Sequence, residues 1–211
     1  MDTSKKAGAV PEETKERILT AARAEFSEHG FQGSSLRRIC SAAGVTTGAL
    51  YFFFQGKDDL FQTVLAQVTE PFAQLVEAHY QRECGSGGGV TEEGADADFE
   101  VTERLLDLYF SNRQTWGILT RHLNHPAVQS FLDRFVEVST AHYQALLEKT
   151  ALPQAVDGFA LHQFVHMQVD TMLTLFSHGF SREEMSAHSR TIVRMLRGAY
   201  AALVSEPGIR G

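Results

Sequence analysis

The amino-acid sequence predicts an all-α protein of about nine helices. Through most of the 211 residues, apolar side chains recur at steps of three and four positions, which is the period of an amphipathic helix. Glycines and prolines divide this pattern into segments, and no segment alternates polar and apolar residues as a β-strand does. Hydrophobic residues make up 43% of the chain, so one or two domains with a buried core can form.

The first predicted helix begins near Glu12 and ends at Gly30. Its apolar stripe consists of Ile18, Leu19, Ala22 and Phe26. Residues 1–11 are polar and are expected to form a flexible arm. Within this arm, Lys5 and Lys6 either reach a minor groove of DNA or belong to a disordered tail.

Two short helices separated by a tight turn are predicted next. Ser35 is a candidate N-cap for the first of them, and Gly44 can adopt the positive φ that ends it. Thr46 or Thr47 can cap the second. The apolar positions of the pair are Leu36, Ile39, Cys40, Ala43, Val45, Leu50 and Phe54. The pattern is typical of a DNA-binding helix-turn-helix, in which the second helix enters the major groove, although a purely structural helical hairpin has similar spacing.

A long helix is expected from Lys57 to about Arg82, with a kink at Pro71. The glycine-rich segment from Cys84 to Asp96 is expected to be a flexible loop. Further helices are predicted at about 97–111, 113–123, 126–149, 154–178 and 182–204. The predicted organisation is a helix-turn-helix domain over 1–60 and a helical body over 61–211.

The net charge of −7 does not exclude nucleic acid as a partner, because the charge is unevenly distributed. Residues 1–60 carry eight basic and eight acidic side chains, whereas the remaining 151 carry 11 basic and 18 acidic ones. Since salt screens charges beyond about 8–10 Å, a neutral N-terminal domain can bind phosphate beside an acidic body.

Other classes of protein are excluded by missing features. No apolar run reaches the roughly 18 residues needed to span a bilayer, and the N-terminus has no secretory signal. The two cysteines, Cys40 and Cys84, are too few for a disulfide framework, which favours the cytoplasm. Neither a nucleophile motif nor a phosphate-binding loop is found, so we expect no cofactor and no enzymatic activity.

Residues 14–65 contain a dense motif, which reads Ile18-Leu-x-Ala-Ala-x-x-x-Phe26-x-x-x-Gly30-Phe31, Ser35-Leu-Arg-Arg-Ile39-Cys-x-x-Ala43-Gly44-Val45-Thr-Thr-Gly48-Ala-Leu50-Tyr51-x-x-Phe54, Lys57 and Leu60. This motif closely resembles the TetR family of bacterial transcriptional regulators, and the resemblance implies an effector-binding and dimerisation domain over 61–211. The resemblance implies a homodimer on a palindromic double-stranded operator, usually a repressor that leaves DNA when a small molecule binds the C-terminal domain. An activator or a ligand-independent regulator of the same fold, a metal sensor and a metal-dependent enzyme are the alternatives.

The resemblance also implies roles for individual residues in binding DNA. Tyr51 and Lys57 resemble family contacts to the phosphate backbone, and Arg37 and Arg38 project from the first helix of the motif. Phe52 stands where relatives often have a polar residue or histidine, and it can contact a thymine methyl group. The candidate DNA contacts are Ser35, Arg37, Arg38, Thr46, Thr47, Gly48, Tyr51, Phe52 and Lys57.

The body is rich in aromatic residues and contains eight of the nine histidines. Apolar side chains between bundle helices can line a pocket for an apolar or aromatic effector. The candidate ligand contacts are Trp116, Phe135, Phe164, His166, Met167 and Asp170, with His122 and His125 as further polar groups. His162, His166 and Asp170 share one helix face and are weak candidates for binding a metal ion, but Gln163 stands where a zinc hydrolase needs a glutamate.

The last two predicted helices are strongly apolar on one side. Two long helices doubled by a two-fold axis would make a four-helix dimer interface, as in the TetR family. The candidate interface residues are Leu161, Val165, Met172, Ile192, Met195, Leu196 and Leu203.

Overall fold

The computed structural model describes residues 11–85, 92–149 and 156–205, and every regular element in these ranges is an α-helix. Three helices come first, α1 (Pro11–Gly33), α2 (Leu36–Ala43) and α3 (Thr47–Phe53). The remaining six are α4 (Lys57–Gly85), α5 (Glu92–Ser111), α6 (Arg113–Arg121), α7 (Pro126–Lys149), α8 (Gly158–Ser177) and α9 (Arg182–Ser205). The all-α prediction with nine helices is confirmed for the described chain.

Helices α1–α3 form a small N-terminal unit around a buried apolar core. The stripe predicted for α1 lies inside it, and the core residues include Ile18, Leu19, Ala22, Phe26, Ile39 and Leu50. Gly30 interrupts the helical backbone of α1 with φ 66° and ψ 178°, close to the predicted end of the first helix. The predicted arm lies outside the described residues, except for Pro11, which begins α1.

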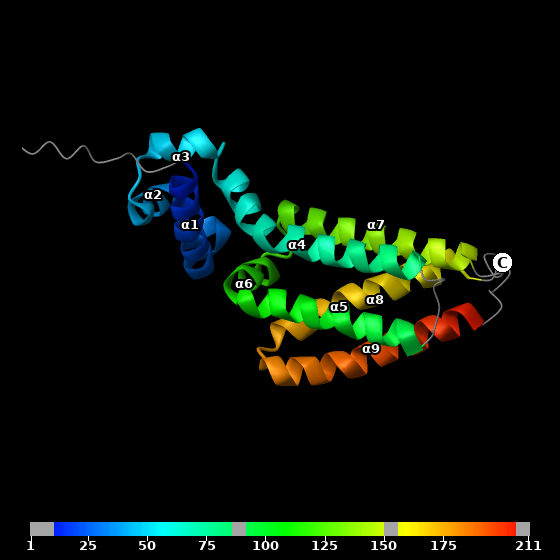
Figure 1. Cartoon of the computed structure of the whole chain (residues 1–211). Coiled ribbons are helices and arrows are strands. Elements are labelled where there is room, and N and C mark those ends of the chain that lie inside the picture. Colours follow the sequence, from blue (N-terminus) through cyan, green and yellow to red (C-terminus); the bar gives the residue numbers. More distant parts are fainter. Residues whose placement is uncertain (1–10, 86–91, 150–155, 206–211) are drawn as a thin grey trace, which may run out of the picture.

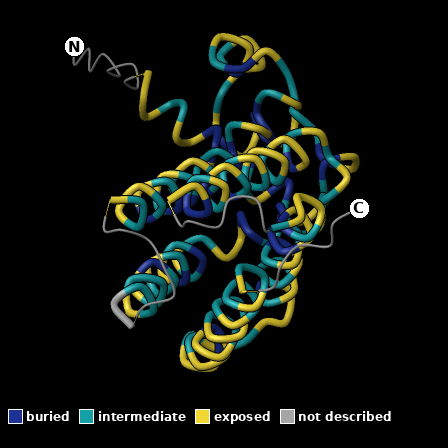
Figure 2. The backbone as a smooth tube through the Cα atoms, turned by 90° about the vertical axis from the view of Figure 1, so that its right-hand side faces the viewer, coloured by how far each residue is buried: buried dark blue, intermediate teal, exposed yellow. Residues whose placement is uncertain are grey.

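Helices α4–α9 form the body, a bundle that extends away from the N-terminal unit (Figure 1). Helix α4 continues through Pro71 and is the long element that joins the two parts, and it changes direction along its length (Figure 1). It packs against α5, α6 and α7, while α9 covers α5 and α8. Buried positions face the interior of the bundle, and exposed positions face outward (Figure 2).

Two boundaries differ from the sequence prediction. The predicted bounds of the loop, Cys84 and Asp96, are both wrong, because α4 extends to Gly85 and α5 already begins at Glu92. Helix α8 begins at Gly158, where the Asp157 side chain accepts a hydrogen bond from the amide of Phe159 and caps the helix. No described helix has the length and hydropathy required to cross a membrane.

Candidate nucleic-acid interface and effector cavity

The turn between α2 and α3 is built by Gly44, Val45 and Thr46. Gly44 has φ 63° and ψ 39°, so it takes the left-handed conformation that the sequence analysis assigned to it. The Val45 amide donates to the carbonyl of Cys40 at 3.0 Å. Thr46 Oγ1 accepts a hydrogen bond of 3.1 Å from the amide of Ala49, which caps α3. The two helices are therefore joined by a short turn whose backbone groups are satisfied.

Helix α3 presents one face to solvent. Leu50 is fully buried, whereas the side chains of Tyr51 and Phe52 are 56% and 78% exposed. The predicted contacts Thr46, Thr47 and Gly48 are exposed at the start of the helix. An exposed aromatic side chain is costly in water, so these residues form a surface available to a binding partner.

Arg38 holds α2 against α1 instead of pointing freely into solvent. Its Nε donates to Oε1 of the buried Glu25 at 2.8 Å, and its Nη2 donates to the carbonyl of Gly33 at 2.6 Å. The amide of Ser35 donates to the same carboxylate oxygen at 2.8 Å. Burial alone would raise the pKa of Glu25, but the hydrogen bonds from Arg38 and Ser35 outweigh it and lower the pKa. Arg37, the neighbouring candidate, is exposed.

Lys57 anchors the start of α4 to the end of α1. Its Nζ donates to the carbonyl of Phe31 at 2.8 Å and lies 3.4 Å from those of Gln32 and Ser34. The ammonium group also lies 4.7 Å from the centre of the Phe31 ring. Arg17 acts similarly at the end of α2, where it donates to the carbonyls of Ala43 and Gly44. Cations at helix C-termini stabilise the helix dipole, so both residues support the fold of the N-terminal unit.

His122 and His125 lie at the junction between the N-terminal unit and the body, and neither lines the cavity described below. Nε2 of His122 accepts a hydrogen bond of 2.9 Å from the amide of Phe31. Its Nδ1 lies 2.7 Å from the carbonyl of Ile118, which requires the proton to sit on Nδ1. The His125 ring packs 4.5 Å from Phe31 and 4.4 Å from Phe61, measured between ring centres. Neither histidine therefore lies where it could contact a molecule in that cavity.

The body contains a cavity of about 230 Å³ between α4, α5, α7, α8 and α9. Most of its wall is apolar, and it includes the predicted contacts Phe135 and Phe164. The apolar wall residues include Phe72, Val76, Val101, Leu105, Leu106, Phe135, Phe164, Met172, Leu175, Ile192, Val193 and Leu196. Ser189 also lines the cavity, and its buried hydroxyl has no hydrogen-bond partner within the described part of the chain.

The other predicted ligand contacts lie elsewhere. Trp116 is completely buried in the core, where its ring centre is 5.0 Å from that of Phe176. His166, Met167 and Asp170 line a groove on the outside of α8 and α9. The α8 residues that line the cavity are Phe164 and others that follow it at steps of three to four positions. Because of the helical period, residues 166, 167 and 170 point to the opposite side of α8.

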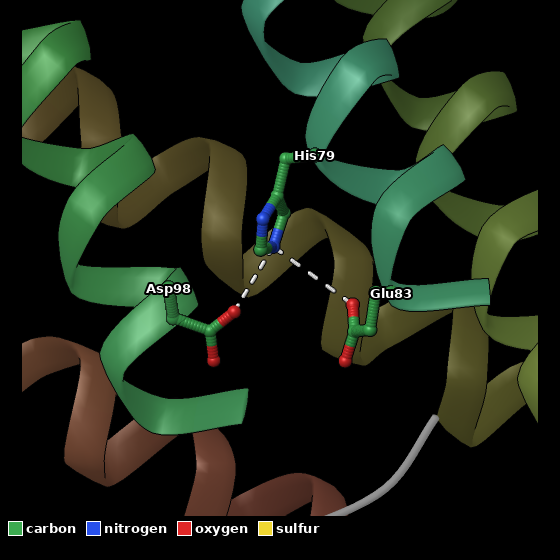
Figure 3. A group of neighbouring side chains, drawn as sticks. All are labelled: His79, Glu83 and Asp98. Atoms are coloured by element: carbon green, nitrogen blue, oxygen red, sulfur yellow. Dashed lines mark ion pairs between the residues drawn. The ribbon is translucent and has the colours of Figure 1, made fainter. Parts of the chain in front are cut away.

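The polar end of the cavity contains His79 and Glu83 of α4 and Asp98 of α5 (Figure 3). These three form the group of potential metal ligands found among the described residues, with ligand atoms within 4.8 Å of one another. The predicted trio of His162, His166 and Asp170 does not form such a group. Its members lie along the outer side of α8, where one helix face alone cannot surround an ion.

The predicted dimer residues fall into three environments. Leu161 and Val165 are buried within the chain, so their assignment to an interface is wrong. Met172, Ile192 and Leu196 line the cavity wall. Two residues remain on more accessible positions of α9, Leu203, which is half-buried, and Met195, which is 67% exposed.

The chain combines a helix-turn-helix, whose second helix is exposed, with a helical body that encloses an apolar cavity. This combination is typical of a DNA-binding transcriptional regulator. Residues 18–64 match the family model for bacterial regulatory proteins of the tetR family. The family model, the curated relatives and the solved structures all indicate a TetR family transcriptional regulator, as the sequence motifs did. Members of this family are DNA-binding proteins and not enzymes, which confirms that expectation as well.

Curated relatives match this chain over different lengths. It is 28% identical over 184 residues to the transcriptional repressor AcnR of Corynebacterium glutamicum, which covers 85% of this chain and 90% of AcnR. It is 42% identical over 64 residues to the transcriptional repressor BepR of Brucella suis, but this covers only 30% of this chain and 31% of BepR. The similarity to BepR is therefore confined to about a third of either protein.

Solved structures share the fold across nearly the whole chain. Salmonella enterica GusR aligns with a TM-score of 0.63 at 23% identity, covering 96% of this chain and 100% of GusR. The multidrug binding protein EbrR, crystallised with malachite green, aligns with a TM-score of 0.59 at 19% identity, covering 86% of this chain and 96% of EbrR. At these identities the likeness shows a common fold.

Proposed function

We propose that the protein is a ligand-responsive repressor that leaves its operator when a small, largely apolar or aromatic molecule occupies the cavity. The observation that carries this proposal is the apolar cavity beside α4, the helix that also holds the N-terminal unit. The unpartnered hydroxyl of Ser189 supports a ligand with one polar group directed at it. AcnR and BepR are named repressors, and EbrR binds an aromatic dye, which agrees with this proposal.

In this proposal the exposed face of α3 enters the major groove. Thr46, Thr47 and Gly48 approach the phosphate backbone and base edges, Tyr51 contacts a phosphate, and Phe52 packs on thymine methyl groups. Arg37 is the cation of α2 with the freedom to reach a guanine, because it is exposed beside this surface. Ser35, Arg38 and Lys57 act mainly by holding the motif in position, since each already bonds to the protein.

The proposed assembly is a homodimer in which the outer sides of α8 and α9 meet a second copy. Phe159, Met167 and Met195 are large apolar residues exposed on these helices. We divide the chain into a DNA-binding domain over 1–60 and an effector and dimerisation domain over 61–211. A two-fold axis would place two α3 helices on the half-sites of a palindromic operator in the cytoplasm, about 34–36 Å apart.

Effector binding is coupled to DNA through α4 and α6. A ligand in the cavity would contact Phe72 and Val76 of α4, whose first residue, Lys57, is bonded to the end of α1. His122 of the α6 C-cap bonds to the same segment. The ligand can shift the DNA-binding equilibrium only by its different affinities for the two states, typically about 1–3 kcal/mol.

The test begins with selection of operator DNA from a random pool and identification of small molecules that co-purify with the protein. Each molecule is then titrated into the protein–operator complex, and release is followed by fluorescence anisotropy. We expect release in the wild type and none in Ser189→Phe, which fills the cavity. The matched control is Ser130→Phe at an exposed position of α7, away from the cavity and the proposed dimer face, which should respond normally. Tighter DNA binding on addition would favour an activator, and no response to any co-purified molecule would favour a ligand-independent regulator.

A further inference from the structure

Three side chains with metal-binding groups converge at the polar end of the cavity. His79 and Glu83 stand one turn apart on α4, and Asp98 faces them from α5 (Figure 3). Nε2 of His79 lies 3.0 Å from Oδ1 of Asp98 and 3.8 Å from Oε2 of Glu83. All three ligand atoms lie within 4.8 Å of one another.

We propose that His79, Glu83 and Asp98 bind a divalent transition-metal ion, for which Zn²⁺ is the appropriate probe. Imidazole and carboxylate ligands at about 2.0–2.2 Å from a tetrahedral zinc ion lie roughly 3.3 Å from each other. The two distances from His79 are already close to that value. The third pair, the oxygens of Glu83 and Asp98, lies within 4.8 Å, so an ion between them would draw these two side chains closer together.

The surroundings hold each carboxylate in place. Nε2 of His142 lies 2.9 Å from Oε2 of Glu83, and the His142 ring stacks on Tyr80 with 3.9 Å between ring centres. Oδ2 of Asp98 pairs with Arg197, which leaves Oδ1 directed at His79. Groups that hydrogen-bond to metal ligands orient them, and their removal typically weakens metal binding about 10–100-fold.

Burial and charge also favour a cation at this position. The side chains of His79, Glu83 and Asp98 are 8%, 17% and 21% exposed. Arg197 compensates the charge of one of the two carboxylates, and a divalent ion between them would compensate the other. Three protein ligands leave a fourth position, and because all three residues line the cavity, water or a donor atom of a bound molecule would fill it.

The experiment is a titration of Zn²⁺ into chelator-treated, full-length protein, in competition with a chromophoric zinc chelator. We expect one high-affinity ion per chain, near-complete loss of this site in Asp98→Asn, and a loss of about 10–100-fold in His142→Phe, which keeps the stacked ring but removes the hydrogen bond to Glu83. Zn²⁺ should raise the midpoint of thermal unfolding of the wild type but not of Asp98→Asn. Unfolding in the presence of chelator verifies that each variant is folded.

Two controls separate this site from other candidates. The double variant His162→Ala/His166→Ala removes the histidine pair on the outer side of α8, and Cys84→Ser removes the thiol 3.7 Å from His142. Both should bind one ion like the wild type. A wild type without a tight site, or an Asp98→Asn variant that keeps it, would overturn the proposal. Because the titration contains no DNA or effector, its result is independent of the proposed repressor function.

Discussion

The amide of Phe31 donates a hydrogen bond to Nε2 of His122, and this contact ties the helix-turn-helix unit to α6 of the body. The preceding residue, Gly30, has φ +66°, and a Cβ placed there would lie 3.3 Å from the same nitrogen. The close approach of the two parts thus depends on a glycine in a conformation that other residues rarely adopt. We therefore expect a displacement of α6 to move the end of α1.

We expect His122→Leu to weaken the coupling between effector and operator. The substitution leaves the Phe31 amide without its partner, which should lower the free energy of unfolding by about 1–3 kcal/mol. Effector should then release operator less completely, although affinity for the DNA-free protein changes little. Anisotropy titrations and urea unfolding measure the two effects. The control is His178→Leu, since His178 is exposed and bonds within its own helix end; equal coupling in both variants would contradict the prediction.

Stability should fall below about pH 6.5 because of His125. Burial lowers the pKa of His125 below its ordinary value of 6.5, and the nearby His122 lowers it further, against the opposing effect of Asp58. The unfolded chain therefore takes up protons first as the pH falls. The stabilisation is fully present above pH 6.5 and is lost progressively as the pH drops through the folded pKa.

The measurement is urea unfolding at several pH values between 7.5 and 5. His125→Gln should show a shallower loss of stability with falling pH than the wild type. His188→Gln is a suitable control, because His188 is an exposed residue of α9 far along the chain from the junction. Parallel pH profiles for the wild type and His125→Gln would exclude His125 as the source.

Adjacent arginines of α2 should have separable roles. Arg37→Ala should reduce discrimination at one base position of each half-site by about 1–3 kcal/mol without changing stability. Arg38→Ala should instead lower the thermal midpoint, because Glu25 loses its guanidinium partner, and weaken binding to all sequences alike. Binding to a panel of single-base operator variants, together with thermal unfolding, distinguishes the two. A base-specific loss in Arg38→Ala would reverse this assignment.

Met195 and Leu196 provide a matched test of the dimer. Met195 is exposed on α9, so Met195→Asp should place a charge in the proposed interface and dissociate the dimer, with loss of operator binding. Leu196 lines the cavity, so Leu196→Ala should alter ligand binding while the protein remains dimeric. Light scattering gives the mass of each variant. A dimeric Met195→Asp protein would show that another surface mediates assembly.

The sequence predicted those features whose causes lie within a few residues of one another. Gly44 and Thr46 define the turn of the motif locally, and the helical period places the buried stripe of α1. The partners of Lys57 and Arg38 could not be predicted, because the carbonyl of Phe31 and the carboxylate of Glu25 come close only after folding.

The lining of the cavity also could not be predicted in full, because it depends on contacts that form only after folding. Which side of α8 faces it depends on the packing of α7 and α9, so of the predicted ligand contacts on α8 Phe164 lines the cavity whereas His166 and Asp170 line the outer groove. The cluster of His79, Glu83 and Asp98 was missed because Asp98 lies beside a segment interpreted as a loop. The spacing of His79 and Glu83 at one helical turn was the available signal.

The contacts at the end of α1 have a consequence for how such regulators diversify. His122 binds the peptide nitrogen of Phe31, and Lys57 binds the peptide oxygens of Phe31, Gln32 and Ser34. Peptide atoms are identical in every sequence, so the exposed side chain at position 32 can vary without loosening this attachment, whereas the buried Ser34 hydroxyl itself donates to the Phe31 carbonyl. We therefore expect that new operator specificities can evolve while the proposed effector response is preserved. Chimaeras that exchange α1–α3 between relatives should remain inducible wherever the glycine at position 30 is retained.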